Sequence, residues 1–115
     1  DALKVGMQLD HIYHAKQLPG KFKMAVSGCH LSCAESWVRD VGLIGRKDGW
    51  ALVIGGNVGA EPRIGQEIAD KLDDASALAA VEKVIAVYVR DAKKGERLGK
   101  MIDRVGIEPF KAALA

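Results

Sequence analysis

Two cysteines separated by three residues are the only thiols in the chain and its first candidates for chemistry. Cys29 and Cys33 follow a segment in which two lysines, Lys21 and Lys23, alternate with apolar residues. Thiolates bind soft metals such as zinc and iron, and lysine ammonium groups attract anions. A closed zinc or iron–sulfur site needs about four protein ligands. The pair of cysteines therefore predicts one half of a soft-metal site.

The residues before the cysteines predict a half-buried strand from Lys21 to Ser27. Apolar and polar positions alternate along this segment, and a period of two is typical of a strand with one face in the core. Lys21 and Lys23 share the polar face, at a spacing that aims two positive charges at one place. A solvated strand face without a ligand is the simpler interpretation of these two lysines.

The residues around the second cysteine predict the start of a helix that ends at about Arg39. Ser32–Glu35 is a capping box, in which the serine hydroxyl and the glutamate carboxylate each accept a bond from the other residue's amide. Cys33 then occupies the first helical position, where unpaired amides and the helix dipole lower the pKa of a thiol. Cys29, in the preceding loop after Gly28, is close enough to face the same centre.

Two more strands are expected after this helix. They cover Val41–Ile44 and Trp50–Ile54, and the turn between them, Arg46–Gly49, contains the Asp-Gly hairpin signal. The Trp50–Ile54 segment is apolar throughout, which favours a central place in its sheet.

A glycine-rich loop follows the third strand and is a second candidate for binding. The chain continues toward Pro62, which suits a first helical turn, so a helix is expected over Pro62–Leu72. Amides at such a junction attract anionic groups, and Arg63 adds a guanidinium. The spacing matches neither a dinucleotide fingerprint nor a Walker loop, and a plain turn without a ligand is the alternative. The candidate binding residues are Gly55, Gly56, Asn57, Gly59 and Arg63.

The remaining segments read as helices that cover the sheet and carry no chemistry. An amphipathic pattern predicts a helix from about Ser76 to Ala92, and shorter helices are expected near both ends of the chain. The shorter helices cover Asp10–Lys16, Glu96–Val105 with a stop at Gly106, and Pro109–Ala115.

Composition excludes several classes of protein. The 115 residues fit one domain, the net charge is only +2, and six aromatic residues are too few for base-stacking platforms, so no nucleic-acid partner is expected. No apolar run reaches the roughly 18 residues of a membrane span. Two cysteines without a secretory signal do not form a disulfide framework, which favours reduced thiols in the cytoplasm.

Five motifs follow one another in order: Leu18–Lys23, Ser27–Glu35, Asp40–Gly45, Gly55–Gly59 and Arg63–Gly65. This series closely resembles the sirohaem and 4Fe-4S domain of nitrite and sulfite reductases. The resemblance covers about residues 18–72, and the helical tail from Ala77 to Ile107 is also similar. It implies an α+β (α/β-like) fold, with a small mixed sheet of three to five strands covered by helices and a helical C-terminal part.

The resemblance also implies roles for the candidate residues. Cys29 and Cys33 become ligands of a 4Fe-4S cluster, with Cys33 bridging to the sirohaem iron. Lys21 and Lys23 become the catalytic cations that bind nitrite or sulfite and supply protons. The glycine loop and Arg63 would meet the carboxylates of sirohaem.

Two departures from the family pattern shape the expectation for this chain. It has no C-x₅-C pair, so a missing half-domain must supply the other cluster ligands, and the family's arginines from the preceding domain are absent. We therefore expect a single domain, with a core at about 18–72 and covering helices at about 76–115, that is a fragment of a longer chain and inactive alone. The start at Asp1 rather than methionine agrees with this expectation.

Two alternatives from other functional classes stay open. One is a non-catalytic binding module that keeps the fold but has lost the cofactor. The other is a structural zinc domain, in which His11 and His14, on one face of the expected first helix, complete a Cys₂His₂ site with the two cysteines.

Overall fold

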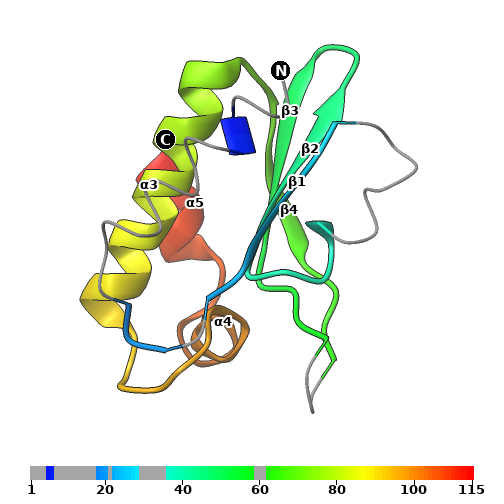
Figure 1. Ribbon diagram of the computed structural model, residues 1–115. Coiled ribbons are helices and arrows are strands. Elements are labelled where there is room, and N and C mark those ends of the chain that lie inside the picture. The colour runs from blue at the N-terminus through cyan, green and yellow to red at the C-terminus, as the bar shows by residue number, and fades with distance from the viewer. Residues whose placement is uncertain (1–4, 7–17, 21, 29–35, 59–61) are drawn as a thin grey trace.

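A four-stranded mixed sheet forms the centre of the molecule, which a computed structural model describes for residues 5–6, 18–20, 22–28, 36–58 and 62–115 (Figure 1). The strands lie in the order of the chain. β1 pairs in parallel with β2, whereas β2–β3 and β3–β4 are antiparallel. Their bounds are β1 Met24–Ser27, β2 Val41–Arg46, β3 Gly49–Ile54 and β4 Gln66–Leu72.

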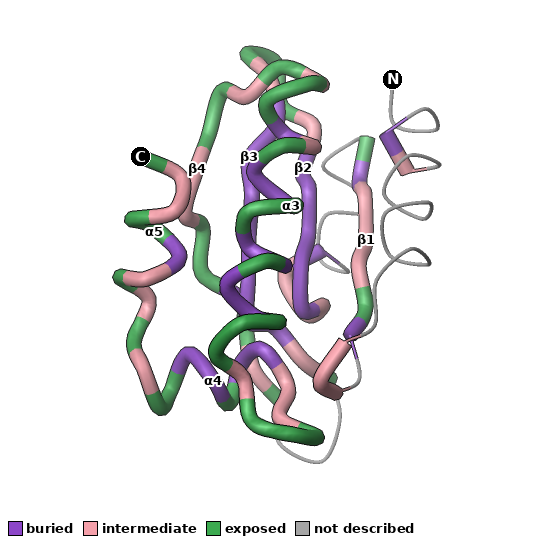
Figure 2. Tube along the Cα trace, turned by 90° about the vertical axis from the view of Figure 1, so that its left-hand side faces the viewer, coloured by how far each residue is buried: buried purple, intermediate pink, exposed green. Residues whose placement is uncertain are grey.

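The central strands β2 and β3 are the most buried part of the sheet (Figure 2). They form a hairpin that closes where Arg46 pairs with Gly49, and Gly49 adopts a φ of 136° that favours glycine. The expected Asp-Gly turn and the central place of the Trp50–Ile54 strand are confirmed. Residues pointing to both faces are apolar here, because each face is covered by another layer of the protein.

Three helices lie on one face of the sheet (Figure 1): α3 Asp74–Asp91, α4 Leu98–Val105 and α5 Glu108–Leu114. Asp73 caps α3 by accepting a bond from the Ser76 amide at 2.7 Å, so the helix begins two residues earlier than expected. The three helices expected in this part of the chain are confirmed, and α4 ends at Gly106 as predicted. No described helix is long and apolar enough to cross a membrane.

One core cluster joins the sheet to these helices. Phe22 and Met24 pack into it together with Leu52, Tyr88 and Phe110, from segments spread over the whole chain. The alternation predicted around β1 is confirmed, because Ser27 is buried on the opposite face, beside Ser36. On that second face a smaller cluster forms from Ile44, Ala51 and Val53 under Trp37.

The helix expected over Pro62–Leu72 is wrong, because this segment contains strand β4. Arg63 forms an antiparallel bridge with Asn57, which turns the chain back along β3. Ile64, Ile68 and Leu72 recur every four residues, as on a helix face, yet Ile64 is 77% exposed while the other two pack on the core. Pairing with the open backbone edge of β3 has overridden the helix propensity of this segment.

The helix expected to reach about Arg39 ends earlier. Ser36 is helical, but residues 37–40 form a turn that brings Trp37 onto the sheet. The Trp37 carbonyl accepts a bond from the Gly65 amide at 2.6 Å, which ties this turn to the residue before β4. The start of this helix and the expected helix Asp10–Lys16 lie outside the described residues.

Gly42 in β2 supplies the first stability prediction. A Cβ at this position would lie 2.3 Å from the Ser36 carbonyl oxygen and 2.7 Å from the Ser36 Cβ. We expect Gly42→Ala to lower the free energy of unfolding by about 3 kcal/mol, because the backbone that it strikes belongs to a packed layer. Urea denaturation followed by circular dichroism measures the loss.

Gly6→Ala is the matched control for this prediction. A Cβ there meets nothing within 4 Å and the residue is helical, so the change should be neutral or stabilising by up to about 1 kcal/mol. An equal loss in both variants would contradict the close-approach explanation for Gly42.

Candidate functional site

The sequence candidates fall at the two ends of the sheet. Lys23 precedes β1, Asp40 precedes β2 and Gly55 follows the antiparallel β3, so these three lie at one end. Gly28, next to Cys29 in the sequence, follows β1 and lies at the other end. A strand of four residues spans about 13 Å, which separates the start of β1 from its end.

Lys23 places an exposed positive charge at its end of the sheet. Its side chain is exposed, and within the described part of the chain no ion pair involves its ammonium group. Its backbone is held firmly by comparison: the amide donates to Asp40 Oδ2 at 2.8 Å, and the carbonyl accepts from the Val41 amide at 3.2 Å. The arrangement suits a cation that must meet an anion at a fixed place.

The glycine loop packs against its neighbours through its backbone. Gly55 and Gly56 are buried, and a Cβ on Gly56 would lie 2.3 Å from the Trp37 carbonyl oxygen. The Gly55 amide donates to the Asp40 carbonyl at 2.9 Å, and the Asn57 amide donates to the Arg63 carbonyl at 3.0 Å. These two amides therefore form hydrogen bonds within the protein, and the main role of the two glycines is to allow close packing.

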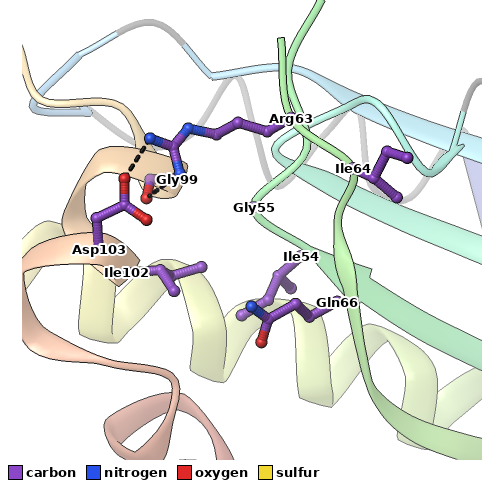
Figure 3. Close-up of a pocket in the computed structure, with 8 residues that line it drawn as sticks. All are labelled: Ile54, Gly55, Arg63, Ile64, Gln66, Gly99, Ile102 and Asp103. Atoms are coloured by element: carbon purple, nitrogen blue, oxygen red, sulfur yellow. Dashed lines mark hydrogen bonds and ion pairs between the residues drawn. The ribbon is translucent and has the colours of Figure 1, made fainter. Parts of the chain in front are cut away.

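Arg63 reaches from the loop to α4 (Figure 3). Its guanidinium pairs with the Asp103 carboxylate and donates to the Gly99 carbonyl at 3.3 Å. The Arg63 hydrogen bond lowers the pKa of Asp103 below its usual value. Beside this contact lies a cavity of about 40 Å³, lined by Ile54, Gly55, Arg63, Ile64, Gln66, Gly99, Ile102 and Asp103.

The two ends of the segment that carries both cysteines are joined by a buried hydrogen bond. The hydroxyl oxygens of Ser27 and Ser36 lie 2.7 Å apart, and Ser36 also donates to the Leu43 carbonyl at 3.4 Å. Two glycines of β2 make room for this contact: Gly42 lies against Ser36, and a Cβ on Gly45 would lie 3.2 Å from the Ser27 carbonyl oxygen. This Ser27–Ser36 clamp brackets Cys29 and Cys33.

Several candidates lie outside the described residues. They are Lys21, Cys29, Cys33, Gly59, His11, His14 and His30. Among the described residues, no group of three or more histidine, cysteine or acidic side chains is arranged to hold a metal ion.

Comparison with known proteins identifies the family. The model of the nitrite and sulphite reductase 4Fe-4S domain matches residues 1–115. The chain belongs to this family. The match extends the resemblance seen in residues 18–72 and the helical tail to the whole chain.

The relatives of this chain are named as sulfite or nitrite reductases. The chain is 38% identical over 114 residues to an assimilatory-type sulfite reductase of Nitratidesulfovibrio vulgaris, covering 99% of this chain and 52% of that protein. It is 31% identical over 116 residues to the large subunit of the NADH nitrite reductase of Escherichia coli K12, covering 99% of this chain and 14% of that protein. It therefore spans about half the length of the first relative and much less of the second.

A solved structure shares the fold of this family member. The structure of the Mycobacterium tuberculosis NirA protein matches with a TM-score of 0.70 at 25% identity, over 85% of this chain and 19% of that one. The α+β fold expected from the resemblance, a small mixed sheet covered by helices, is confirmed.

Sequence reasoning missed the residues that support the candidate site of this 4Fe-4S domain. The buried Asp40 carboxylate forms an ion pair with the partly buried Arg97 beside Lys23, and Asp103 holds Arg63. Asp40 opens one of the five motifs, but nothing in its local pattern distinguishes a buried carboxylate from a solvated one. Arg97 is 57 residues away from Asp40, so only the fold brings the two together.

The Ser27–Ser36 clamp generates the second prediction. Ser36→Ala removes the buried hydrogen bond between the two serine hydroxyls and should lower the free energy of unfolding by about 1–3 kcal/mol. Changing both serines to alanine should cost less than the sum of the two single changes. A double-mutant cycle of urea denaturation curves measures the coupling. Strictly additive losses would show that the two hydroxyls do not interact.

Proposed function

We propose that this chain is the part of a sirohaem- and 4Fe-4S-dependent nitrite or sulfite reductase that supplies two cluster ligands and the substrate-binding lysines. The observation that carries the proposal is the match of all 115 residues to the 4Fe-4S domain family, in a sequence with the Cys29–Cys33 pair. The reaction is the six-electron reduction of a small oxyanion. The proposed enzyme works in the cytoplasm, where unpaired thiols stay reduced.

Cys29 and Cys33 are the proposed cluster ligands, and Cys33 would also be the thiolate that connects the cluster to sirohaem. Cysteine thiolates are the ligands of iron–sulfur clusters, so the donor set of this chain fits the group in kind. A cluster needs about four thiolates, so two more come from a C-x₅-C pair outside these residues. When bound, the cluster and sirohaem would pass electrons from an external donor to the substrate. On this proposal the 115-residue chain alone is inactive.

Lys21 and Lys23 bind the oxyanion and deliver protons to it. The exposed Lys23 ammonium, which no described carboxylate neutralises, supports this role. A fixed positive charge stabilises the negative charge of the oxyanion, and a positioned ammonium donates a proton as a general acid.

The glycine loop and Arg63 contribute to holding sirohaem in this proposal. Arg63 already carries a counter-charge from Asp103, so a carboxylate of the ligand would compete with Asp103 for the guanidinium. Gly55 and Gly56 act mainly by keeping the loop close to α4 and to the turn at Trp37, which their packing supports. Asn57 and Gly59 complete the proposed binding loop.

The cysteine assignment is tested by cofactor content in the full-length protein. After anaerobic reconstitution, the wild type should hold iron and acid-labile sulfide and absorb visible light, and Cys29→Ser or Cys33→Ser should lose most of the cluster. A wild type without this absorption would favour a non-catalytic module. One zinc per chain, lost on changing His11 or His14, would favour the Cys₂His₂ domain instead.

The lysine assignment is tested by turnover. Lys23→Ala in the full-length enzyme should lower kcat/KM for nitrite or sulfite by about 10²-fold, while the sirohaem absorption stays. Lys47→Ala is the matched control, because Lys47 is also exposed but lies in the hairpin at the other end of the sheet. Equal activity in the two variants would contradict the proposed role of Lys23.

A further inference from the structure

A buried carboxylate stands behind the exposed lysine. Only 1% of the Asp40 side-chain surface is exposed, and its Oδ2 atom accepts two hydrogen bonds. One comes from the Lys23 amide at 2.8 Å and the other from Arg97 Nη2 at 2.6 Å. A buried charge is costly unless it is paired and hydrogen-bonded, so Arg97 is what makes Asp40 tolerable at this place.

The pair is arranged around the Lys23 backbone. A bidentate arginine–carboxylate pair would use two parallel bonds. Here a single Oδ2 serves both Arg97 and the Lys23 amide, and Asp40 Oδ1 and Arg97 Nε, both buried, form no hydrogen bond with the described residues. Replacing a buried ion pair by apolar groups is often neutral for stability. A contribution to stability therefore does not explain this geometry. A role in fixing the Lys23 amide explains it.

The backbone of Asp40 extends the same connection. Its carbonyl accepts from the Gly55 amide, and the next residue, Val41, donates to the Lys23 carbonyl. Arg97 stands immediately before α4, the helix whose Gly99 carbonyl and Asp103 carboxylate hold Arg63. The Asp40–Arg97 pair thus links the lysine, the glycine loop and the helix that carries the Arg63 contact.

We propose that Asp40 and Arg97 are positioning residues that set where the Lys23 ammonium meets the oxyanion. This inference rests on the proposed function of Lys23. A lysine side chain has many rotamers, and fixing its backbone on both sides reduces the space that its charge explores before the anion binds. Loss of the pair should weaken the contribution of Lys23 without removing the cofactors.

The first test is backbone hydrogen exchange in the full-length protein, measured by mass spectrometry. Asp40→Asn and Arg97→Gln should speed exchange about tenfold in peptides that contain Lys23 and leave the β2–β3 hairpin unchanged. Arg46→Gln is the matched control, since it breaks an arginine–carboxylate pair with Glu67 at the other end of the sheet. Unchanged exchange at Lys23, or equal acceleration in the hairpin, would overturn the proposal.

The second test is a kinetic double-mutant cycle with sulfite and with nitrite. Arg97→Gln should lower kcat/KM about tenfold in the wild-type background and less than about twofold in the Lys23→Ala background, because a positioning residue acts only through its lysine. Additive losses would overturn the positioning role. Arg97→Lys keeps the charge but not the guanidinium, so it should recover part of the lost kcat/KM. It also replaces Asp40→Asn in the exchange experiment if that variant fails to fold.

The two arms separate this proposal from the proposed function. If the wild type binds no cluster and no sirohaem, the proposed function fails, yet hydrogen exchange still reports whether the pair fixes Lys23. If the wild type is active but the cycle is additive, the function stands and the positioning role fails.

Discussion

The buried carboxylate of Asp40 is the constraint around which one end of the sheet is arranged. Asp40 immediately precedes β2, and its carboxylate accepts bonds from the residue before β1 and from the residue before α4. Its carbonyl accepts a bond from the amide that follows β3. Three parts of the chain that are far apart in sequence satisfy one another there. A charge with so little access to solvent must have such partners, so their positions are set together.

The two faces of the sheet are covered by different clusters of residues. The face under α3 carries the large core cluster and accounts for most of the apolar burial. The opposite face carries a small cluster under Trp37 and the Ser27–Ser36 clamp, which brackets both cysteines. Gly42 and Gly56 allow backbones to approach on this second face at distances that no side chain would permit. Among the described residues, the face with the smaller apolar cluster is thus the one associated with the proposed chemistry.

The fold changes the interpretation of the glycine loop. A glycine-rich segment before a helix is typical of an anion-binding turn, but the segment after this loop is strand β4. No helix begins at Pro62, and the amides of Gly55 and Asn57 are already bonded inside the protein. Arg63 keeps its charge but shares it with Asp103, a residue 40 positions further along.

The sequence by itself determined the elements whose signals are local: the alternation around β1, the Asp-Gly hairpin, the apolar β3, the amphipathic α3 and the ordered motifs of the family. Apart from the ordered motifs, these signals depend on residues close together in the sequence, so a short window contains the whole cause. Only the tertiary structure decided that the segment after Pro62 is a strand, because the open edge of β3 is a property of the sheet. It also decided the partners of Asp40, Arg63 and Ser27. Their hydrogen bonds join residues 9 to 57 positions apart, and no local pattern records which distant donor will satisfy a buried polar group.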